Sequence, residues 1–363
     1  MSALSLAPMD HAGRIERLRA AMQCDALLVT NPKNIRYLTG FTGSAAMVLV
    51  TGDGVLFTSD GRYATQAAEQ LRVDAQVEIG LPSFQRDAVV KAASACGRVG
   101  LEAASVTWAQ QRLMAGEWFT SAEVVPTDRL VERLREVKEA AEVERIAAAA
   151  SIADAALAAL LPMLHEGPTE AEFGLALDME MRRRGATAPS FETIVASGPN
   201  GAKPHHRPST RRVERGELVV LDFGALVDGY CSDMTRTVSV GEPADPLYAR
   251  MHDVVRQSQA AGVAAVSSGV AAVGIDTACR DVIGAAGWGD RFVHGTGHGV
   301  GLDIHEAPAV GSTSTDTLAA GNVVTVEPGV YLPEHGGVRI EDTVVVTPDG
   351  CRILTQSPKE LVA

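Results

Sequence analysis

The sequence is poor in cysteine and shows no pattern of paired cysteines. Its 363 residues contain five cysteines, and none of them stands in a CxxC spacing. Scattered cysteines in odd number do not suit a disulfide framework, which favours a chain that is kept reduced. We therefore expect a cytoplasmic protein.

The sequence also lacks a targeting signal, a long apolar run and an excess of positive charge. Its first eleven residues hold no basic segment followed by a long apolar one, and no apolar run approaches the roughly 20 residues of a membrane helix. Lys and Arg number 32 against 45 Asp and Glu, which gives a net charge of -13. We expect no secretion, no membrane insertion and no binding of nucleic acid through bulk charge, whereas an acidic excess suits a protein that collects cations.

A chain of 363 residues suits two domains. Within residues 1–125, short apolar runs at 25–30, 45–50 and 54–60 have the composition of strands and alternate with stretches of helical spacing. Residues 129–164 are rich in Ala, Leu, Glu and Arg and predict a mostly helical segment, with the domain boundary near its start. We predict a smaller α/β domain over 1–130 and a larger domain over 131–363.

The larger domain is predicted to be of the α+β class. Thr169 and Glu172 form a capping box and Gly185 supplies a stop, so a helix is expected between them, followed by strands from 191 to 240. Helices at about 245–266 and 275–286 then precede strands that run to residue 346. Two rounds of helix, helix and strands indicate a duplicated architecture.

Two aspartates share one face of a predicted hairpin. The dipeptide Asp-Gly at 228–229 joins two apolar runs and is a strong signal for a two-residue turn. The implied register sets Asp222 opposite Thr235. It also sets Gly224 opposite Asp233, which leaves room beside the carboxylates. The two aspartates are then diagonal neighbours with no basic residue on their face, and they repel each other unless a cation neutralises them. A solvent-facing polar side of the hairpin is the alternative.

Two glutamates lie on later apolar strands. Alternation over residues 322–332 puts Glu327 on the same face as Thr325. Alternation over residues 337–346 puts Arg339 and Glu341 on one face. Each glutamate taken alone is more typical of an exposed acid at a strand end, because glutamate is rarely buried without a partner.

A glycine-rich segment adds imidazole. Residues 292–308 carry His294, His298 and His305 among four glycines that allow a close approach of the backbone. A phosphate-binding loop is the alternative, but the segment contains neither GxxxxGK[ST] nor GxGxxG between a strand and a helix. The repeated histidines are better explained by a metal.

One imidazole with four carboxylates suits divalent Mn, Co, Fe or Zn better than a structural zinc, which prefers Cys and His. Five protein ligands exceed what one ion with an open position takes, and they suit two ions roughly 3.5–4 Å apart. Two such ions lower the pKa of a shared water and make it a nucleophile at neutral pH. The residues therefore predict a dinuclear centre for hydrolysis.

The same segments resemble the pita-bread metallopeptidases, which comprise Xaa-Pro aminopeptidases, Xaa-Pro dipeptidases (prolidases) and methionine aminopeptidases. The resemblance runs through LDFGALVDGYCSDMTRT, HGTGHGVGLDIHE, VVTVEPGVYLPEHGGVRIEDT and SFETIVASGPNGAKPHHRP. NIRYLTGFTGS and TSDGRY resemble the creatinase-type N-terminal domain. The resemblance implies a pita-bread (creatinase/aminopeptidase) catalytic domain of the α+β class, preceded by a smaller α/β domain of the creatinase type.

The resemblance also implies roles for single residues. The metal ligands that it implies are Asp222, Asp233, His298, Glu327 and Glu341, with Asp233 and Glu341 as bridging carboxylates. The catalytic residues that it implies are His205, His305 and Glu327, and the residues on the substrate side are His294, Arg339 and Tyr331. His206 lies next to the motif, so a shift of one position between His205 and His206 stays open.

The activity that the resemblance implies is that of an Xaa-Pro aminopeptidase, which releases the residue in front of proline from small peptides. An Xaa-Pro dipeptidase stays open, because the sequence does not show how the site beyond the proline is closed. A noncatalytic pita-bread peptide-binding protein is a further alternative, although such relatives lose metal ligands that are present here. The resemblance also implies a homodimer and two divalent ions, with Mn favoured and Co, Zn or Fe tolerated.

Overall fold

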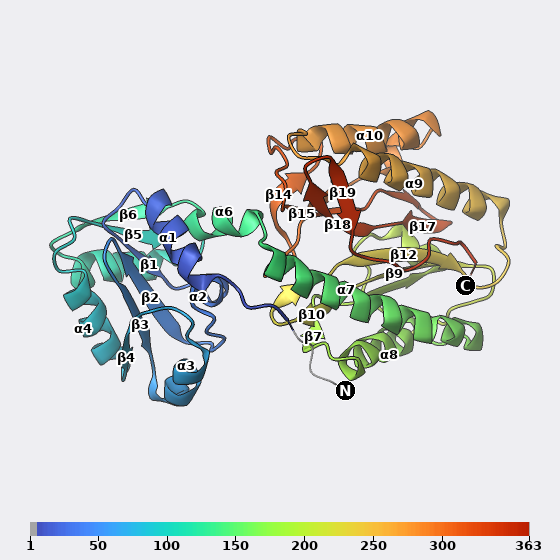
Figure 1. Cartoon of the computed structure of the whole chain (residues 1–363). Helices are drawn as coiled ribbons and strands as arrows, with labels where there is room; N and C mark the ends of the chain where they lie inside the picture. The colour runs from blue at the N-terminus through green and yellow to red at the C-terminus, as the bar shows by residue number, and fades with distance from the viewer. Residues whose placement is uncertain (1–5, 363) are drawn as a thin grey trace. The chain divides into compact units, whose positions relative to one another are not determined.

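The computed structural model describes residues 6–362 and divides the chain into two compact units. The smaller unit is Pro8–Arg135, and the larger unit contains the rest of the described chain. The division falls between Arg135 and Glu136, at the end of helix α6 (Leu130–Glu136), whereas the boundary expected from the sequence was at residue 130, where this helix begins. Figure 1 shows helices packed against strands in each unit.

The smaller unit is built on one six-stranded mixed sheet in the order β4-β3-β2-β1-β5-β6. The three strands predicted from the sequence are confirmed as β1 to β3 to within one residue at each end. The strands are β1 (Ala26–Val29), β2 (Ala46–Thr51), β3 (Val55–Ser59), β4 (Gln76–Ile79), β5 (Arg98–Glu102) and β6 (Glu123–Thr127). The helices before α6 are α1 (His11–Ala21), α2 (Pro32–Thr39), α3 (Ala64–Gln70), α4 (Pro82–Ala92) and α5 (Trp108–Leu113).

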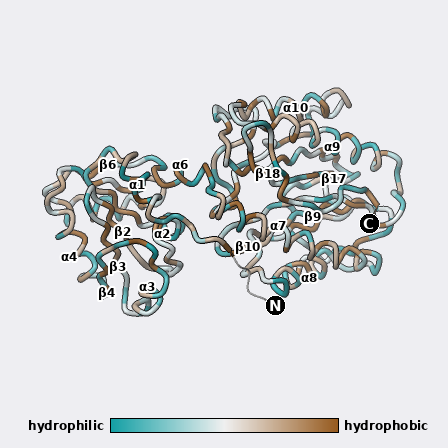
Figure 2. The backbone as a smooth tube through the Cα atoms, in the orientation of Figure 1, coloured by the Kyte–Doolittle hydropathy of each residue, from teal (hydrophilic) through white to brown (hydrophobic). Residues whose placement is uncertain are grey.

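This sheet is covered on both faces. Every residue of β1 and β3 is buried, and successive side chains of a strand point to opposite faces, so neither face is open to water at the centre. Ala26 and Leu28 pack with Val89 of α4 on one face. Helices α1 and α2 contact β2. Figure 2 shows strongly hydrophobic positions along β2 and β3.

The helix predicted over residues 129–164 is interrupted between α6 and α7 (Ala140–Leu160). In the gap, the side chain of Lys138 is only 1% exposed, and its Nζ lies 2.7 Å from Oε1 of Glu306. Glu139 then provides the N-terminal cap of α7. The break follows from these tertiary contacts, which override the helical propensity of the segment.

Replacing Lys138 by methionine should destabilise the larger unit. The change leaves the carboxylate of Glu306 without its buried cation, and such losses cost about 3 kcal/mol of unfolding free energy. The free energy of unfolding from urea titration measures the effect. Lys91→Met, at an exposed position, is the matched control and should change stability by less than about 0.5 kcal/mol. Equal stabilities of the two variants would contradict the assignment.

Helix α7 is more apolar than the sequence analysis allowed. Within residues 6–362, the stretch Ala140–Glu166 is long and apolar enough to cross a membrane by length and composition. The expectation that no apolar segment approaches the length of a membrane helix was therefore wrong. The many alanines of this stretch keep its mean hydropathy high despite its few charged residues. However, Ala149, Ala153 and Leu157 of α7 pack into the core of the larger unit. We interpret the composition of α7 as that of a core helix.

The larger unit contains two successive sets of helices and strands, as predicted. The first set is α7, α8 (Glu170–Arg183), β7 (Ala188–Pro189), β8 (Ile194–Ser197), β9 (Leu218–Phe223), β10 (Ala225–Val227), β11 (Tyr230–Cys231) and β12 (Met234–Ser239). The second set is α9 (Pro246–Ala265), α10 (Ala272–Ala285), β13 (Gly297–Gly299), β14 (Glu306–Val310), β15 (Val323–Val326), β16 (Gly329–Leu332), β17 (Gly336–Arg339), β18 (Asp342–Thr347) and β19 (Gly350–Ile353). In Figure 1, α7 and α8 lie on one side of the strands of this unit and α9 and α10 on the other.

The register of the predicted hairpin is confirmed, since Asp222 on β9 pairs with Thr235 on β12. The role expected for Gly224 was wrong. A Cβ at this position would lie 1.9 Å from the carbonyl oxygen of Ser232 and 2.3 Å from Oγ of Ser190. Glycine is therefore required by close packing of the backbone, not by a need for space beside the carboxylates.

The two sets have separate apolar cores that meet along β9, β12, β17 and β18. Helices α7 and α8 pack with β9 and β12 in one core, and α9 and α10 pack with β15 and β18 in the other. Polar contacts join them: the backbone N–H of Glu341 donates to the carbonyl of Thr235 at 3.1 Å. Oγ1 of Thr343 donates to the carbonyl of Asp233 at 2.8 Å. The segments that carry the predicted ligands are thus held against one another.

Candidate active site

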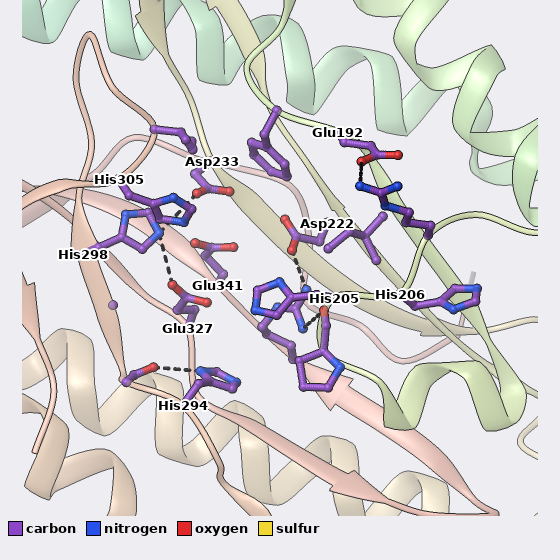
Figure 3. A pocket seen from close by; sticks show the side chains of 18 residues that line it. Glu192, His205, His206, Asp222, Asp233, His294, His298, His305, Glu327 and Glu341 are labelled. Atoms are coloured by element: carbon purple, nitrogen blue, oxygen red, sulfur yellow. Dashed lines mark hydrogen bonds and ion pairs between the residues drawn. The ribbon is translucent and has the colours of Figure 1, made fainter. Parts of the chain in front are cut away.

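The five predicted metal ligands line one cavity of about 450 Å³ in the larger unit. Strand β9 carries Asp222 and β13 carries His298, whereas Asp233, Glu327 and Glu341 lie at the ends of β12, β15 and β18. Figure 3 shows four of them, Asp233, His298, Glu327 and Glu341, turned toward a common space. The fold therefore brings together acids and an imidazole that are far apart in the sequence.

His298 is placed by the two glycines beside it. A Cβ at Gly297 would lie 2.0 Å from the carbonyl oxygen of Thr325, and a Cβ at Gly299 would lie 2.2 Å from that of Ala307. The glycines predicted to allow a close approach therefore let β13 fit between its neighbours β14 and β15. The register of β13 against β14 shifts between the two glycines, and His298 projects from this irregularity into the cavity.

The ring of His298 presents Nε2 to the carboxylates. Its Nδ1 donates to the carbonyl of Gly299 at 3.0 Å, which leaves the lone pair of the neutral ring on Nε2. Burial lowers the pKa of His298 and so favours the neutral ring. Nε2 lies 3.3 Å from Oε1 of Glu327 and 3.6 Å from Oδ2 of Asp233. Lone pairs that face one another at these distances require a shared proton or a metal cation.

The carboxylates of this cluster oppose one another in the metal-free protein. Burial raises the pKa of Glu327 to about 7, and the charge of Asp222 contributes in the same direction. Burial also raises the pKa of Asp233, with further contributions from Glu341 and Asp222. Burial and the charge of Glu327 raise the pKa of Glu341. A divalent cation would offset both the burial and the repulsion of these charges.

The residues fit a divalent metal. Asp233, His298 and Glu341 each offer a ligand atom, and these atoms lie within 4.8 Å of one another. Oε2 of Glu341 accepts a hydrogen bond from Oγ1 of Thr235 at 2.7 Å, but its Oε1 is buried and has no hydrogen-bond partner among residues 6–362. A buried carboxylate oxygen without a partner is costly unless a cation binds it. Carboxylate oxygens with one imidazole nitrogen are a donor set for Mn, Fe, Co or Zn.

Arg339 corrects one premise of the sequence analysis. No basic residue was expected beside the aspartates of the hairpin, yet Nη2 of Arg339 on β17 donates to Oδ2 of Asp222. Nη1 of Arg339 donates to Tyr331 Oη at 2.8 Å, and this hydroxyl donates to Nε2 of His294 at 2.8 Å. The premise failed because β17, which belongs to the second set, contacts β9 and so brings Arg339 to the face of the hairpin. The residues predicted for the substrate side thus form one chain that ends on a predicted metal ligand.

Three histidines occupy different places around the cavity. His205 and His305 are exposed residues that line it, and the ring of His305 lies edge-on to His298 with centroids 4.3 Å apart. Nε2 of His206 instead lies 2.8 Å from a carboxylate oxygen of Glu170, which is buried. Figure 3 shows the ring of His206 directed away from the carboxylate cluster. This geometry favours His205 over His206 as the residue that faces a substrate.

Two buried ionic residues near the site were not predicted from the sequence, namely Lys138 and Glu170. Lys138 holds Glu306, the neighbour of His305, and Glu170 holds His206, the neighbour of His205. In the sequence, Glu170 is an acid in the first turn of a helix, where the helix dipole is enough to explain an acidic residue. Nothing in the local pattern distinguished it from Glu172, which forms the capping box.

The fold and this site together define a metal-dependent peptidase. Residues 144–348 match the model of metallopeptidase family M24, and residues 14–137 match that of the creatinase/prolidase N-terminal domain. The chain belongs to metallopeptidase family M24, and it has the pita-bread fold preceded by a creatinase-type domain. The family resemblance and the fold class inferred from the sequence are thereby confirmed, and the requirement for a divalent metal is that of the family.

Relatives of this chain match it over almost its whole length. It is 42% identical over 352 residues to the uncharacterized peptidase YqhT of Bacillus subtilis, a match that covers 96% of this chain and 99% of the relative. An Xaa-Pro dipeptidase structure from Bacillus anthracis has a TM-score of 0.93 at 40% identity, covering 97% of this chain and 99% of that one. An X-Pro aminopeptidase structure from Thermotoga maritima has a TM-score of 0.89 at 34% identity, covering 95% and 99%.

Proposed function

We propose that this metallopeptidase hydrolyses the bond between an N-terminal residue and a following proline in small peptides. The observation that carries the proposal is the convergence of four carboxylates and one imidazole in a single cavity of about 450 Å³. The names of similar proteins from Bacillus anthracis and Thermotoga maritima support the preference for proline.

The residues that would hold two divalent ions are Asp222, Asp233, His298, Glu327 and Glu341. Such ions supply a water of lowered pKa and polarise the carbonyl of the scissile bond. Asp233 and Glu341 are buried acids at the centre of the cluster, which suits them to contact both ions. Mn is the metal that we favour, and Co, Zn and Fe suit the same donor set.

The side chains around the ions can move protons and hold the substrate. The carboxylate of Glu327 lines the same cavity as the other ligands, where it can accept a proton from the attacking water. Partial burial of its ring lowers the pKa of His305, which favours the neutral ring at pH 7. A neutral ring at the cavity wall can donate one N–H to a carbonyl oxygen that gains negative charge, and His205 lies on the same cavity.

The cavity also has an apolar wall. Phe191, Ile194, Pro204 and Ile304 line it together with the carboxylates. A proline ring has no charge and no N–H when it follows another residue, so an apolar surface beside the metal ligands suits it. We assign this wall to the proline of the substrate.

An Xaa-Pro dipeptidase is the second candidate. The names of similar proteins favour it, since the structure from Bacillus anthracis and a relative from Pyrococcus furiosus, 35% identical over 356 residues, are both called Xaa-Pro dipeptidases. The two activities differ in whether the site beyond the proline accepts a further residue. The aminopeptidase remains the function that we propose first.

Hydrolysis of matched peptides by the Mn-loaded protein tests the proposal. We expect cleavage of Ala-Pro-Ala and no comparable cleavage of Ala-Ala-Ala, which has the same length without proline. Faster cleavage of Ala-Pro than of Ala-Pro-Ala would favour the dipeptidase. A protein that cleaves none of these peptides and binds no metal would instead be a noncatalytic peptide-binding protein. We further propose that the enzyme is a cytoplasmic homodimer, which sedimentation analysis of its mass would test.

A further inference from the structure

Glu170 is a fully buried carboxylate that lies outside the metal cluster. One of its oxygens accepts hydrogen bonds from the backbone N–H and the hydroxyl of Ser197, both at 2.8 Å, and from Asn200 at 3.1 Å. The other accepts from Nε2 of His206 at 2.8 Å and from the backbone N–H and hydroxyl of Ser209 at 3.0 and 2.6 Å. A single side chain at the start of α8 therefore binds both ends of the segment 197–209.

These hydrogen bonds explain why the charge of Glu170 persists in the core. Burial acts to raise its pKa, but the hydrogen bonds from Ser209, Ser197, Asn200 and His206 outweigh burial and lower the pKa to about 2. All of these groups donate to the carboxylate. A neutral amide of the same shape would turn an NH2 group toward donors and could not accept from all of them.

The segment held by Glu170 forms part of the cavity wall. Its middle residues, Pro204 to Arg207, all line the cavity. The carbonyl of Pro204 accepts from Nη1 of Arg339 at 3.4 Å, and Arg339 also binds Asp222. His205 is therefore flanked by two contacts: its preceding residue is held by Arg339, and its following residue is held by Glu170.

The turn before Pro204 has no room to shift. A Cβ at Gly336 would lie 2.6 Å from the carbonyl oxygen of Gly198, and a Cβ at Gly337 would lie 2.1 Å from that of Gly201. The turn 198–202 thus packs directly on the backbone of β17, the strand that carries Arg339. Loss of the bonds from Glu170 would free the later part of the segment, residues 203–209, because the earlier part stays packed on β17.

We propose that Glu170 is a positioning residue that holds residues 203–209 so that His205 reaches the substrate. The proposal rests on the proposed function, in which His205 contacts a peptide bound at the cavity. Glu170 itself touches neither the substrate nor the metal ligands, and it acts through His205. Its role explains a buried charge that the metal site alone does not require.

A double-mutant cycle of Glu170→Gln and His205→Ala tests this role. In the Mn-loaded enzyme, Glu170→Gln should lower kcat/KM for an Xaa-Pro peptide by roughly 10-fold to 100-fold, the effect of a misplaced contact. In the His205→Ala background the same change should cost less than about 3-fold, because the group that it positions is already absent. Glu172→Gln, an exposed acid in the same helical turn, is the matched control and should leave activity unchanged.

Hydrogen–deuterium exchange of the same variants provides a measurement that does not need a substrate. Glu170→Gln should speed exchange in residues 203–209, while bound Mn stays at the wild-type level. Equal losses of activity in both backgrounds, no loss at all, or unchanged exchange in residues 203–209 would overturn the proposal. If the wild-type enzyme cleaves no Xaa-Pro peptide, only the proposed function is contradicted. The hydrogen–deuterium exchange of residues 203–209 still tests the role of Glu170 in that case. If Glu170→Gln does not fold, His206→Ala, which removes the bond from Glu170 to the residue next to His205, replaces it in the cycle.

Discussion

Asp233→Asn should reduce kcat/KM for Xaa-Pro peptides by at least roughly 10³-fold and remove bound metal. Loss of a residue that only hydrogen-bonds to a metal ligand already lowers metal affinity or activity by roughly 10-fold to 100-fold, and loss of the ligand itself should cost more. Asp233 is buried, its Oδ2 lies 3.6 Å from Nε2 of His298, and it belongs to the three-residue ligand cluster. Asparagine keeps the shape of the side chain but removes the charge that a cation needs. Activity assays and metal analysis of the purified variant measure both effects.

The control for this variant is Asp253→Asn. Asp253 is an exposed acid on α9 that forms a surface ion pair with Arg256, so its loss removes the same charge without touching the cavity. It should retain wild-type activity and metal content. An Asp233→Asn protein that is active and fully loaded with metal would refute the assignment of Asp233 as a ligand.

In the metal-free protein, protonated Glu327 should contribute stability near pH 5 that is lost as pH rises to about 8. The pKa of Glu327 is about 7 in the metal-free fold against 4.5 for an unperturbed glutamate, so the folded state holds a proton that the unfolded state releases. A group with a raised pKa favours the folded state when protonated, and this advantage is lost as pH rises through the folded pKa. Burial raises the pKa of Asp233 and Glu341 in the same direction. The expected loss is a few kcal/mol.

Melting temperatures of the chelator-treated protein between pH 5 and pH 8 measure this effect. Glu327→Gln, which cannot ionise, should lose less stability than the wild type between pH 5 and pH 8. Saturating Mn should reverse the trend, because metal binds the deprotonated carboxylates and its affinity rises with pH. A Glu327→Gln variant whose profile runs parallel to that of the wild type would contradict the raised pKa of Glu327.

The parts of the site that the sequence predicted are those set by local pairing. The two-residue turn at 228–229 fixes the register that sets Asp222 opposite Thr235, and strand alternation puts Glu327 beside Thr325, whose hydroxyl lies 3.1 Å from it. Both follow from the period of two residues in a strand. The choice of His298 among three histidines needed the family resemblance, because alternation gives no information in a segment with so many glycines.

The parts that the sequence missed depend on contacts between distant segments. Arg339 neutralises Asp222 because β17 lies beside β9, a placement that no local pattern contains. The helix break at Lys138 depends on Glu306, which is far along the chain. Glu170 looked like an ordinary first-turn acid, yet it binds a segment that ends at Ser209. Strand β4 of the smaller unit was missed because its residues are largely exposed and lack a long apolar run.

The central claim is that carboxylates from separate strands and one imidazole bind two divalent ions. Anomalous diffraction from crystals of the Mn-loaded protein tests it most directly. The claim predicts two anomalous peaks, one of them contacted by His298, with Asp233 and Glu341 contacting both. A map without peaks among Asp222, Asp233, His298, Glu327 and Glu341 at saturating Mn would contradict it.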